Sequence, residues 1–371
     1  MELSRICEYT SRRIDSSSLT VDNYISTENM MQNKGGVVDA SKVPTEKAIE
    51  FLPGDILISN IRPYFKKIWL ADKRGGCSSD VLCIRALSGT DSMYLYYLLA
   101  QDAFFDYVMT GAKGSKMPRG DKSQIMQWDI NLPGIEEQRR VASILKSIDD
   151  KIALNNRINH NLEELVQERF NALIAGDNGQ GFCQLSDIID VNPTRRLSKN
   201  TLARCIEMSQ LSTNGSFPIG WEYKAYNGGM KFINGDTLMA RITPCLENGK
   251  VSYVNFLESS EVGFGSTEYI VLRSKEGYPT ELTYFLARNP GFVDFAVKNM
   301  NGSSGRQRVS GDTIAHYLLP VISTDLIRSF ADIAKASMAI IRKNCFENRS
   351  LVLTRDTLLP ALMRGELSCN N

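Results

Sequence analysis

The chain has 371 residues, and its 43 lysines and arginines against 42 aspartates and glutamates give a net charge of +1. One hydrophobic core seldom serves so long a chain, which predicts two domains. A nearly neutral chain weighs against a nucleic-acid-binding protein, so any DNA binding must use local patches or a partner that neutralises phosphates.

Three features of the sequence predict a cytoplasmic protein. The chain has no apolar run of roughly 18 residues, which a membrane span would need. Its first residues lack the apolar stretch and the small-residue cleavage site of a secretion signal. The eight cysteines form no CxxC pair and many have apolar neighbours, which favours buried reduced thiols over disulfides or a metal site.

In chain order, the first half predicts a turn and strand, a second strand, an amphipathic helix and a Gly/Ser loop, and the second half repeats this order. GDILISNIRP at 54–63 returns as GDTLMARITP at 235–244, and LYYLLAQDAFFDYVMTGAKGS returns as TYFLARNPGFVDFAVKNMNGSS. In each ten-residue phrase Gly-Asp predicts a turn, the apolar residues a strand and the proline its end.

Five blocks share this order, and the offset between the copies grows only from 181 to 189 residues. Chance would explain one similar phrase but not five blocks in one order, so the sequence indicates an internal duplication with a few loop insertions. A core strand explains the apolar residues of the phrase. It does not explain the basic residues near its end, which makes Arg62, Lys66 and Arg241 candidates for DNA binding.

A long helical pattern follows each copy, from Ile135 to Ala175 and from about Asp325 to Arg364. A helix of about 40 residues spans about 60 Å. Spacings of three and four mark a heptad-like seam on each helix. The predicted seam residues are Leu145, Ile148, Ile152, Asn155, Asn159 and Leu162 on the first helix and Ile341, Asn344, Asn348 and Leu351 on the second.

Asparagines recur at matching positions of the two seams. A polar residue in an apolar seam can fix the register of a coiled coil at a cost in stability, and solvent-facing asparagines are the alternative. The linker at 176–181 is too short for a parallel pair. The helices should therefore pack antiparallel, with Asn155 opposite Asn348 and Asn159 opposite Asn344.

The predicted fold class is α+β, with two similar mixed α/β domains joined by two long helices that pack as an antiparallel coiled coil with pseudo-twofold symmetry. The predicted boundaries are 1–133 for the first domain, 134–180 for a central helical spacer, 181–320 for the second domain and 321–371 for a C-terminal helical spacer.

The sequence offers little for catalysis. His160 and His316 lack partner clusters, no GxxxxGK[ST] phosphate loop occurs, and the Asn-Pro at 192–193 lacks the second proline and aromatic residue of an adenine methyltransferase. The acidic residues form no nuclease-like cluster. We therefore expect a recognition protein rather than an enzyme, with no catalytic residue, cofactor or metal of its own.

The recognition candidates lie in equivalent loops, GAKGSKMPRGDKSQ at 111–124 and NGSSGRQRVSGD at 301–312. Glycines let a backbone approach a phosphate, and arginine or glutamine can bind purine edges. A solvated loop without a ligand is the competing interpretation. The predicted DNA-binding residues of the loops are Lys113, Lys116, Arg119 and Lys122 in the first and Arg306, Gln307 and Arg308 in the second.

The chain resembles the specificity (S) subunits of type I restriction-modification systems over essentially its whole length. The resemblance rests on the two ten-residue phrases, on LPGIEEQRRVASILKSIDDKI at 132–152 and on LLPALMRGEL at 358–367. It implies two target-recognition domains that each read half of a split double-stranded DNA target, and helices that bind two methyltransferase (M) subunits. Restriction (R) subunits would join through the complex, and S-adenosylmethionine and ATP would bind to the partners.

The segment that leads into the second long helix, LPVISTDLIRSF at 319–330, lacks the Glu-Gln of the first. The two M subunits are therefore not expected to bind with equal affinity. A different class of function stays open. A duplicated protein-protein scaffold or inhibitor module without DNA readout would also suit the near-neutral charge. The DNA target itself cannot be deduced from one sequence.

Overall fold

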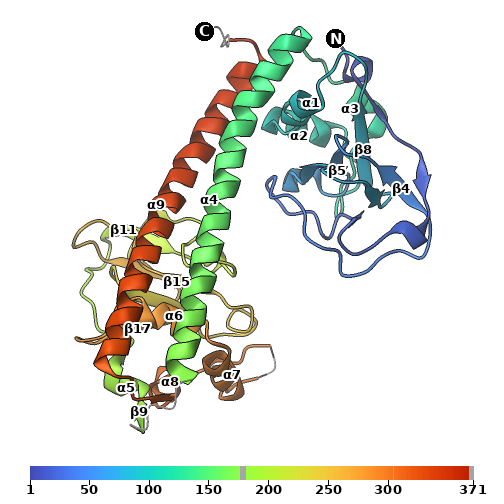
Figure 1. Ribbon diagram of the computed structural model, residues 1–371. Coiled ribbons are helices and arrows are strands. Elements are labelled where there is room, and N and C mark those ends of the chain that lie inside the picture. Colours follow the sequence, from blue (N-terminus) through green and yellow to red (C-terminus); the bar gives the residue numbers. More distant parts are fainter. Residues whose placement is uncertain (176–180, 304, 367–371) are drawn as a thin grey trace. The chain divides into compact units, whose positions relative to one another are not determined.

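The computed structural model describes residues 1–175, 181–303 and 305–366, so most of the linker predicted at 176–181 lies outside the described residues. The chain forms two compact units (Figure 1). Unit 1 comprises Met1–Lys151 and Leu351–Asn371, and Unit 2 comprises Ile152–Ser350. Each unit takes in part of both long helices, whereas the sequence-based boundaries treat the helices as separate spacers.

Unit 1 contains two four-stranded sheets. The first is antiparallel, in the order β1 (Cys7–Tyr9), β8 (Val81–Ala86), β5 (Ile56–Ser59), β6 (Ile68–Leu70). The second has the order β2 (Arg13–Ile14), β4 (Ala48–Phe51), β7 (Gly75–Cys77), β3 (Tyr24–Ile25), of which β7 and β3 are parallel. The short helices are α1 (Ser92–Leu99), α2 (Asp102–Thr110) and α3 (Lys122–Met126), with 3-10 turns η1 (Leu3–Arg5), η2 (Ser16–Ser18) and η3 (Pro63–Phe65).

Unit 2 contains two four-stranded sheets and one strand pair. Their orders are β10 (Ile189–Val191), β17 (Tyr269–Ser274), β14 (Asp236–Ala240), β15 (Val251–Tyr253), then β12 (Glu222–Ala225), β11 (Leu202–Ile206), β16 (Gly263–Gly265), β13 (Met230–Phe232), and β18 (Leu318–Pro320) with β9 (Phe182–Gln184). The short helices are α5 (Leu185–Ile188), α6 (Leu282–Ala287), α7 (Pro290–Lys298) and α8 (Gly311–Ala315), with a 3-10 turn η4 (Met208–Gln210).

The two units repeat one topology. The order β10-β17-β14-β15 in Unit 2 reproduces β1-β8-β5-β6 in Unit 1. The register repeats as well, because Ile56 pairs with Ile84 in Unit 1 and their repeat counterparts, Thr237 and Leu272, pair in Unit 2. The internal duplication and the mixed α/β fold that the sequence predicts are confirmed.

The Gly-Asp of the repeated phrase forms the predicted turn. Its glycine has a φ of +91° in one copy and +87° in the other, a conformation that favours glycine. The carboxylates of Asp55 and Asp236 each accept a backbone N–H three residues earlier, at 2.7 and 2.8 Å. Both aspartates are buried and also bind an arginine of the neighbouring strand, Arg85 at 2.7 Å and Arg273 at 2.9 Å. The aspartate is therefore a structural residue that ties the turn to the sheet.

The two long helices are α4 (Ile135–Ala175) and α9 (Thr324–Met363), as the sequence predicts to within one residue. In Unit 1, Asp149 of α4 binds Arg355 of α9 at 2.8 Å. In Unit 2, the rings of Phe170 on α4 and Phe330 on α9 lie 5.9 Å apart. Rising residue numbers on α4 meet falling numbers on α9, so the helices pack antiparallel in both units.

The seam asparagines form hydrogen-bonded pairs within Unit 2. Asn155 Nδ2 donates to Asn348 Oδ1 at 2.9 Å, and Asn344 Nδ2 donates to Asn159 Oδ1 at 2.9 Å. These are the partners that the antiparallel order predicts. Three of the four asparagines are buried, with Asn155 only 1% exposed, so they do not simply face solvent.

The helices also belong to the domain cores. Val141 and Leu145 of α4 pack with Leu359 of α9 in the core of Unit 1, and Phe170 and Ile341 lie in the core of Unit 2. The remaining predicted seam residues, Ile148, Ile152, Leu162 and Leu351, are half-buried. Among the described residues, no helix is both long and apolar enough to cross a lipid bilayer.

Candidate nucleic-acid interface

In Unit 1, backbone hydrogen bonds hold the predicted recognition loop, residues 111–124, against the end of β5. The N–H of Arg62 donates to Pro118 O at 2.8 Å, and the N–H of Gly120 donates to Asn60 O at 3.3 Å. Within the loop, Lys113 and Arg119 exchange N–H···O bonds of 2.9 Å in both directions. The last residues of the repeated phrase, which follow β5, therefore hold the loop through their backbone.

Unit 2 reproduces this arrangement at the end of β14. The N–H of Thr243 donates to Gln307 O at 3.1 Å, and the N–H of Val309 donates to Arg241 O at 3.0 Å. Asn301 and Arg308 exchange bonds of 2.9 Å, as Lys113 and Arg119 do in Unit 1. Both halves thus place an arginine at the same point of the same small backbone scaffold.

The two equivalent arginines differ in their ion pairs. Among the described residues, the guanidinium of Arg119 contacts one carboxylate, from NH2 to Asp80 Oδ1 at 3.3 Å, and its side chain is 56% exposed. Arg308 binds Glu268 through Nε at 2.8 Å and NH2 at 2.7 Å, and its NH1 donates to Arg306 O at 3.1 Å. This hydrogen bonding from Arg308 holds the pKa of Glu268 below its usual value, although burial opposes the shift. Bonds on all three nitrogens therefore fix the guanidinium of Arg308. The guanidinium of Arg119 has N–H donors that make no hydrogen bond with a described residue.

The other predicted residues of Unit 1 lie on or near the same loop. Lys113 pairs with Asp121 at 2.9 Å and Lys66 with Asp102 at 3.0 Å. The ammonium of Lys122 lies 5.9 Å from the ring centre of Tyr9. Lys116 is exposed and forms no ion pair with a described residue.

In Unit 2, Arg306 is exposed, and Gln307 is half-buried with its backbone N–H donating to the hydroxyl of Thr243 at 3.1 Å. Arg241 is half-buried, and its Nε is a buried donor without a partner among the described residues, as is Nε of Arg62 in Unit 1. Ser304 of this loop lies outside the described residues.

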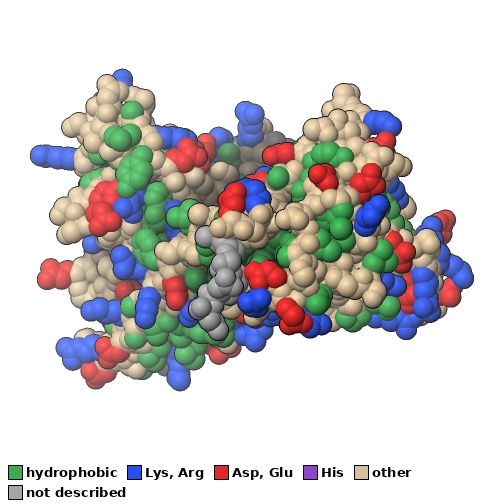
Figure 2. All heavy atoms as spheres, turned by 90° about the horizontal axis from the view of Figure 1, so that it is seen from above, with side chains coloured by type: hydrophobic (Ala, Val, Ile, Leu, Met, Phe, Trp, Pro, Cys, Tyr) green, Lys and Arg blue, Asp and Glu red, His purple; other side chains and the backbone are tan. Residues whose placement is uncertain are grey.

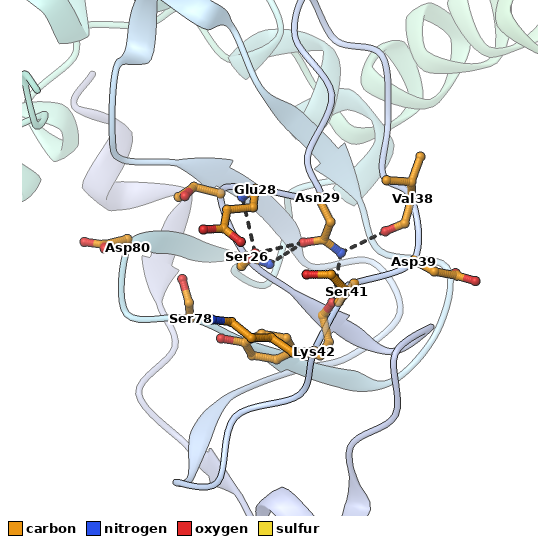
Figure 3. Close-up of a pocket in the computed structure, with 12 residues that line it drawn as sticks. Ser26, Glu28, Asn29, Val38, Asp39, Ser41, Lys42, Ser78 and Asp80 are labelled. Carbon is orange, nitrogen blue, oxygen red and sulfur yellow. Dashed lines mark hydrogen bonds between the residues drawn. The ribbon is translucent and has the colours of Figure 1, made fainter. Parts of the chain in front are cut away.

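A polar pocket of about 350 Å³ adjoins the Unit 1 loop through Asp80 (Figure 3). Its lining includes Ser26, Glu28, Lys42 and Ser78 in addition to Asp80. Asn29 fixes the conformation of the chain between residues 24 and 38. Its side chain donates to Tyr24 O at 3.0 Å and to Val38 O at 2.8 Å, and accepts from the N–H of Ser26. Sequence reasoning missed this pocket because residues 26–42 have no recognised motif and no counterpart among the repeated blocks.

Basic and acidic side chains are interspersed over the face shown in Figure 2, in keeping with the net charge of +1. A local patch therefore has to provide any attraction for phosphates. Lysines that are already paired, such as Lys66 and Lys113, would exchange a carboxylate for a phosphate oxygen rather than bring an unpaired charge.

The fold and the paired loops define a class of protein, a duplicated chain in which two equivalent domains share a long antiparallel helix pair. Residues 1–164 match the family model described as the type I restriction modification DNA specificity domain. The HindI specificity subunit of Haemophilus influenzae is 21% identical over 98% of both chains. The EcoAI specificity subunit of Escherichia coli is 30% identical over 36% of this chain and 23% of its own length.

A crystal structure of the S subunit of a type I restriction-modification system from M. genitalium shares the fold. Its TM-score is 0.62 with 16% identity, over 98% of this chain and 95% of that one. Residues 1–164 therefore carry a match to the DNA specificity domain of type I restriction-modification systems, and the chain is similar over nearly its whole length to a specificity subunit of such a system.

Proposed function

We propose that this chain is the DNA-recognition subunit of a cytoplasmic type I restriction-modification complex. Each domain would read one half of a bipartite, asymmetric double-stranded DNA target. The observation that carries the proposal is the scaffold that both units share, in which equivalent backbone bonds present Arg119 and Arg308 from loops of different sequence. Equivalent scaffolds with different side chains suit two half-sites of different sequence.

The two loops would read DNA in different ways. The exposed guanidinium of Arg119 has donors left for a bidentate contact to guanine O6 and N7. Arg308 would act mainly by holding the loop, because Glu268 and Arg306 occupy donors on all three of its nitrogens. Arg306 and Gln307 would then be the base-reading candidates of the second domain. Lys66, Lys113, Lys116 and Lys122 in Unit 1 and Arg62 and Arg241 at the strand ends would contact phosphates.

The helix pair would dock two M subunits, and R subunits would join through the complex. The chain would need no cofactor, since S-adenosylmethionine and ATP would bind to the partner subunits.

The proposal is tested in cells that carry the M subunit with or without this chain. Sequencing of methylated adenines should show a bipartite motif that disappears when the chain is deleted. A gel shift of the co-purified complex on random duplex DNA separates the DNA-binding proposal from a scaffold without readout. A complex that assembles but neither shifts DNA nor directs methylation would favour the scaffold.

A further inference from the structure

We propose that one acidic position of the repeat, Asp80 in Unit 1 and Glu268 in Unit 2, decides whether the arginine beside it reads a base. The aspartate leaves the guanidinium of Arg119 available to a base, whereas the glutamate keeps Arg308 as a support of its loop. The inference rests on the proposed function, because it assumes that the loops read DNA. It adds two positioning residues that act on specificity through an arginine.

The two acidic residues occupy the same position of the repeat. Asp80 directly precedes β8, and Glu268 directly precedes β17. Their offset falls within the range of the five repeated blocks. The residues that follow them pair with equivalent residues of the neighbouring strand, Val81 with Ser59 and Tyr269 with Ala240. The structure therefore makes Asp80 and Glu268 repeat counterparts, as Arg119 and Arg308 are.

One residue at the end of the preceding strand positions both partners of each ion pair. The N–H of Asn60 donates to Asp80 O at 2.9 Å, and the N–H of Arg241 donates to Glu268 O at 3.0 Å. The carbonyl oxygens of Asn60 and Arg241 accept from the residue that follows the loop arginine, at 3.3 Å in Unit 1 and 3.0 Å in Unit 2. Acid and arginine thus start from the same backbone frame in both units.

On this shared frame the two ion pairs differ. In Unit 1, NH2 of Arg119 meets one oxygen of Asp80 at 3.3 Å. In Unit 2, Arg308 meets both oxygens of Glu268, from Nε at 2.8 Å and from NH2 at 2.7 Å. The side chains of the first pair are 56% and 41% exposed, and those of the second 39% and 26%. The additional methylene of glutamate carries the carboxylate to the guanidinium and lets both oxygens bind.

The strength of the ion pair determines what a base has to displace. A single exposed contact between an arginine and a carboxylate contributes little, so a guanine edge can take the guanidinium of Arg119. A bidentate pair is stronger and fixes the plane of the guanidinium. A guanine would have to break that pair before it could bind Arg308.

A second charge acts in the same direction as the longer side chain. Hydrogen bonds from Arg308 lower the pKa of Glu268 most, and the charge of Arg241 lowers it further, while burial opposes both. The repeat counterpart of Arg241 is Asn60, which is neutral. The carboxylate of Unit 2 is therefore held in its charged form by two arginines.

Lengthening the acid in Unit 1 should abolish reading by Arg119. Asp80 is 41% exposed, so the additional methylene of Asp80→Glu has room at the surface. The new carboxylate should bind Arg119 through both oxygens, as in Unit 2. The preference for guanine at one position of the first half-site should fall at least about fivefold, with the other positions unchanged.

Shortening the acid in Unit 2 should have the opposite effect. Glu268→Asp should replace the bidentate pair by a single contact and release donors of Arg308. One position of the second half-site should then gain a preference for guanine, and the first half-site should stay as it is.

The test uses the complex of the full-length chain with its M subunit. Sequencing of methylated adenines gives the motif, and competition binding with single-base variants of the target gives each preference. Asp72→Glu and Glu276→Asp are the matched controls, because they make the same exchanges at exposed positions outside the loops. Both controls should leave the motif unchanged, and thermal melting verifies that each variant is folded.

A double variant distinguishes positioning from a general loss of structure. If the acid acts through the arginine, Asp80→Glu combined with Arg119→Ala should give the same motif and affinity as Arg119→Ala alone. A structural effect of the longer side chain would instead add to the loss caused by Arg119→Ala.

The outcomes separate the inference from the proposed function. An unchanged first half-site in Asp80→Glu, a loss spread over several positions, or additive losses in the double variant would overturn the inference. An unchanged second half-site in Glu268→Asp would overturn it as well. In each of these cases the proposed function stands. A complex of the unsubstituted chain that neither shifts DNA nor directs methylation would overturn the proposed function itself.

Discussion

Arg119 and Arg308 occupy the same position in the repeat, yet only Arg308 is bound on all three nitrogens of its guanidinium. A guanidinium that keeps donors toward solvent can bind the two acceptors of a guanine, whereas a clamped one cannot do so without breaking its ion pair. Equivalent positions in a duplicated chain can therefore serve reading in one half and support in the other.

Arg119→Ala should relax one base position of the first half-site and cost about 1–3 kcal/mol of binding free energy. Lys116→Ala, an exposed change on the same loop, is the control and should weaken binding to all sequences alike. Methylation sequencing and binding to single-base variants of the target measure both effects. A uniform loss for Arg119→Ala would mean that Arg119 contacts phosphate instead.

Arg308→Ala should affect several positions of the second half-site together, because it frees the loop rather than removing one reader. Arg308→Lys should rescue little, since lysine cannot make the bidentate contact with Glu268. The same methylation sequencing gives the result. Loss of specificity at a single base would show that Arg308 reads DNA directly.

The Arg308–Glu268 pair should make the stability of Unit 2 depend on acid pH. The pKa of Glu268 is lowered in the folded chain, so the pair stabilises fully above the ordinary value of 4.5, and this stabilisation is lost as the pH falls through the lower folded value. Glu268→Gln should therefore flatten part of the acid dependence of thermal melting between about pH 6 and pH 3. Glu276→Gln, at an exposed position, should leave that dependence as it is.

At the scale of elements, sequence reasoning predicted the helices and their pairing well. The heptad pattern over about 40 residues leaves little freedom in the register, and Asn155 meets Asn348 as expected. It could not predict the clamp on Arg308, because Glu268 lies 40 residues away and many acidic residues could have met that arginine. It also treated the helices as spacers, whereas Phe170 and Ile341 complete the core of Unit 2.

The pair formed by Asn159 and Asn344 offers a test of the seam. Asn159→Leu should destabilise the chain by about 1–3 kcal/mol, because the buried Nδ2 of Asn344 would lose its acceptor. The double variant Asn159→Leu with Asn344→Leu should recover most of that loss, since both polar groups are removed. Urea unfolding followed by circular dichroism measures the midpoints. Equal midpoints for the single variant and the parent chain would show that the bond contributes nothing to stability.

At the scale of the whole molecule, the duplication predicts modular specificity. Replacing residues 183–320 with the matching segment of a related chain should change one half of the methylated motif and leave the other unchanged. The reason is that each recognition loop is held by the strands of its own unit. Methylation sequencing decides the result, and a swap that alters both halves would contradict modular readout.

The spacer between the half-sites should depend on helix length. Deleting four residues from both α4 and α9 at equivalent positions removes about 6 Å of rise and should shorten the unread spacer by one or two base pairs. Removing four residues from α4 alone is the control, and it should break the asparagine pairing and abolish assembly. An unchanged spacer in the double deletion would mean that the helices do not set it.

The asparagine pairs have one more consequence, which concerns self-recognition. Asn348 is the repeat counterpart of Asn159, and Asn344 is the counterpart of Asn155, so each pair joins one member of each kind. A half-length chain of residues 1–175 would therefore carry both members on its own helix. Two such chains could satisfy each other, with Asn155 of one copy against Asn159 of the other, and form a symmetric dimer. A dimer of identical domains would read the same sequence twice in opposite directions. The half-length chain should therefore recognise a palindromic target, whereas the full-length chain recognises an asymmetric one.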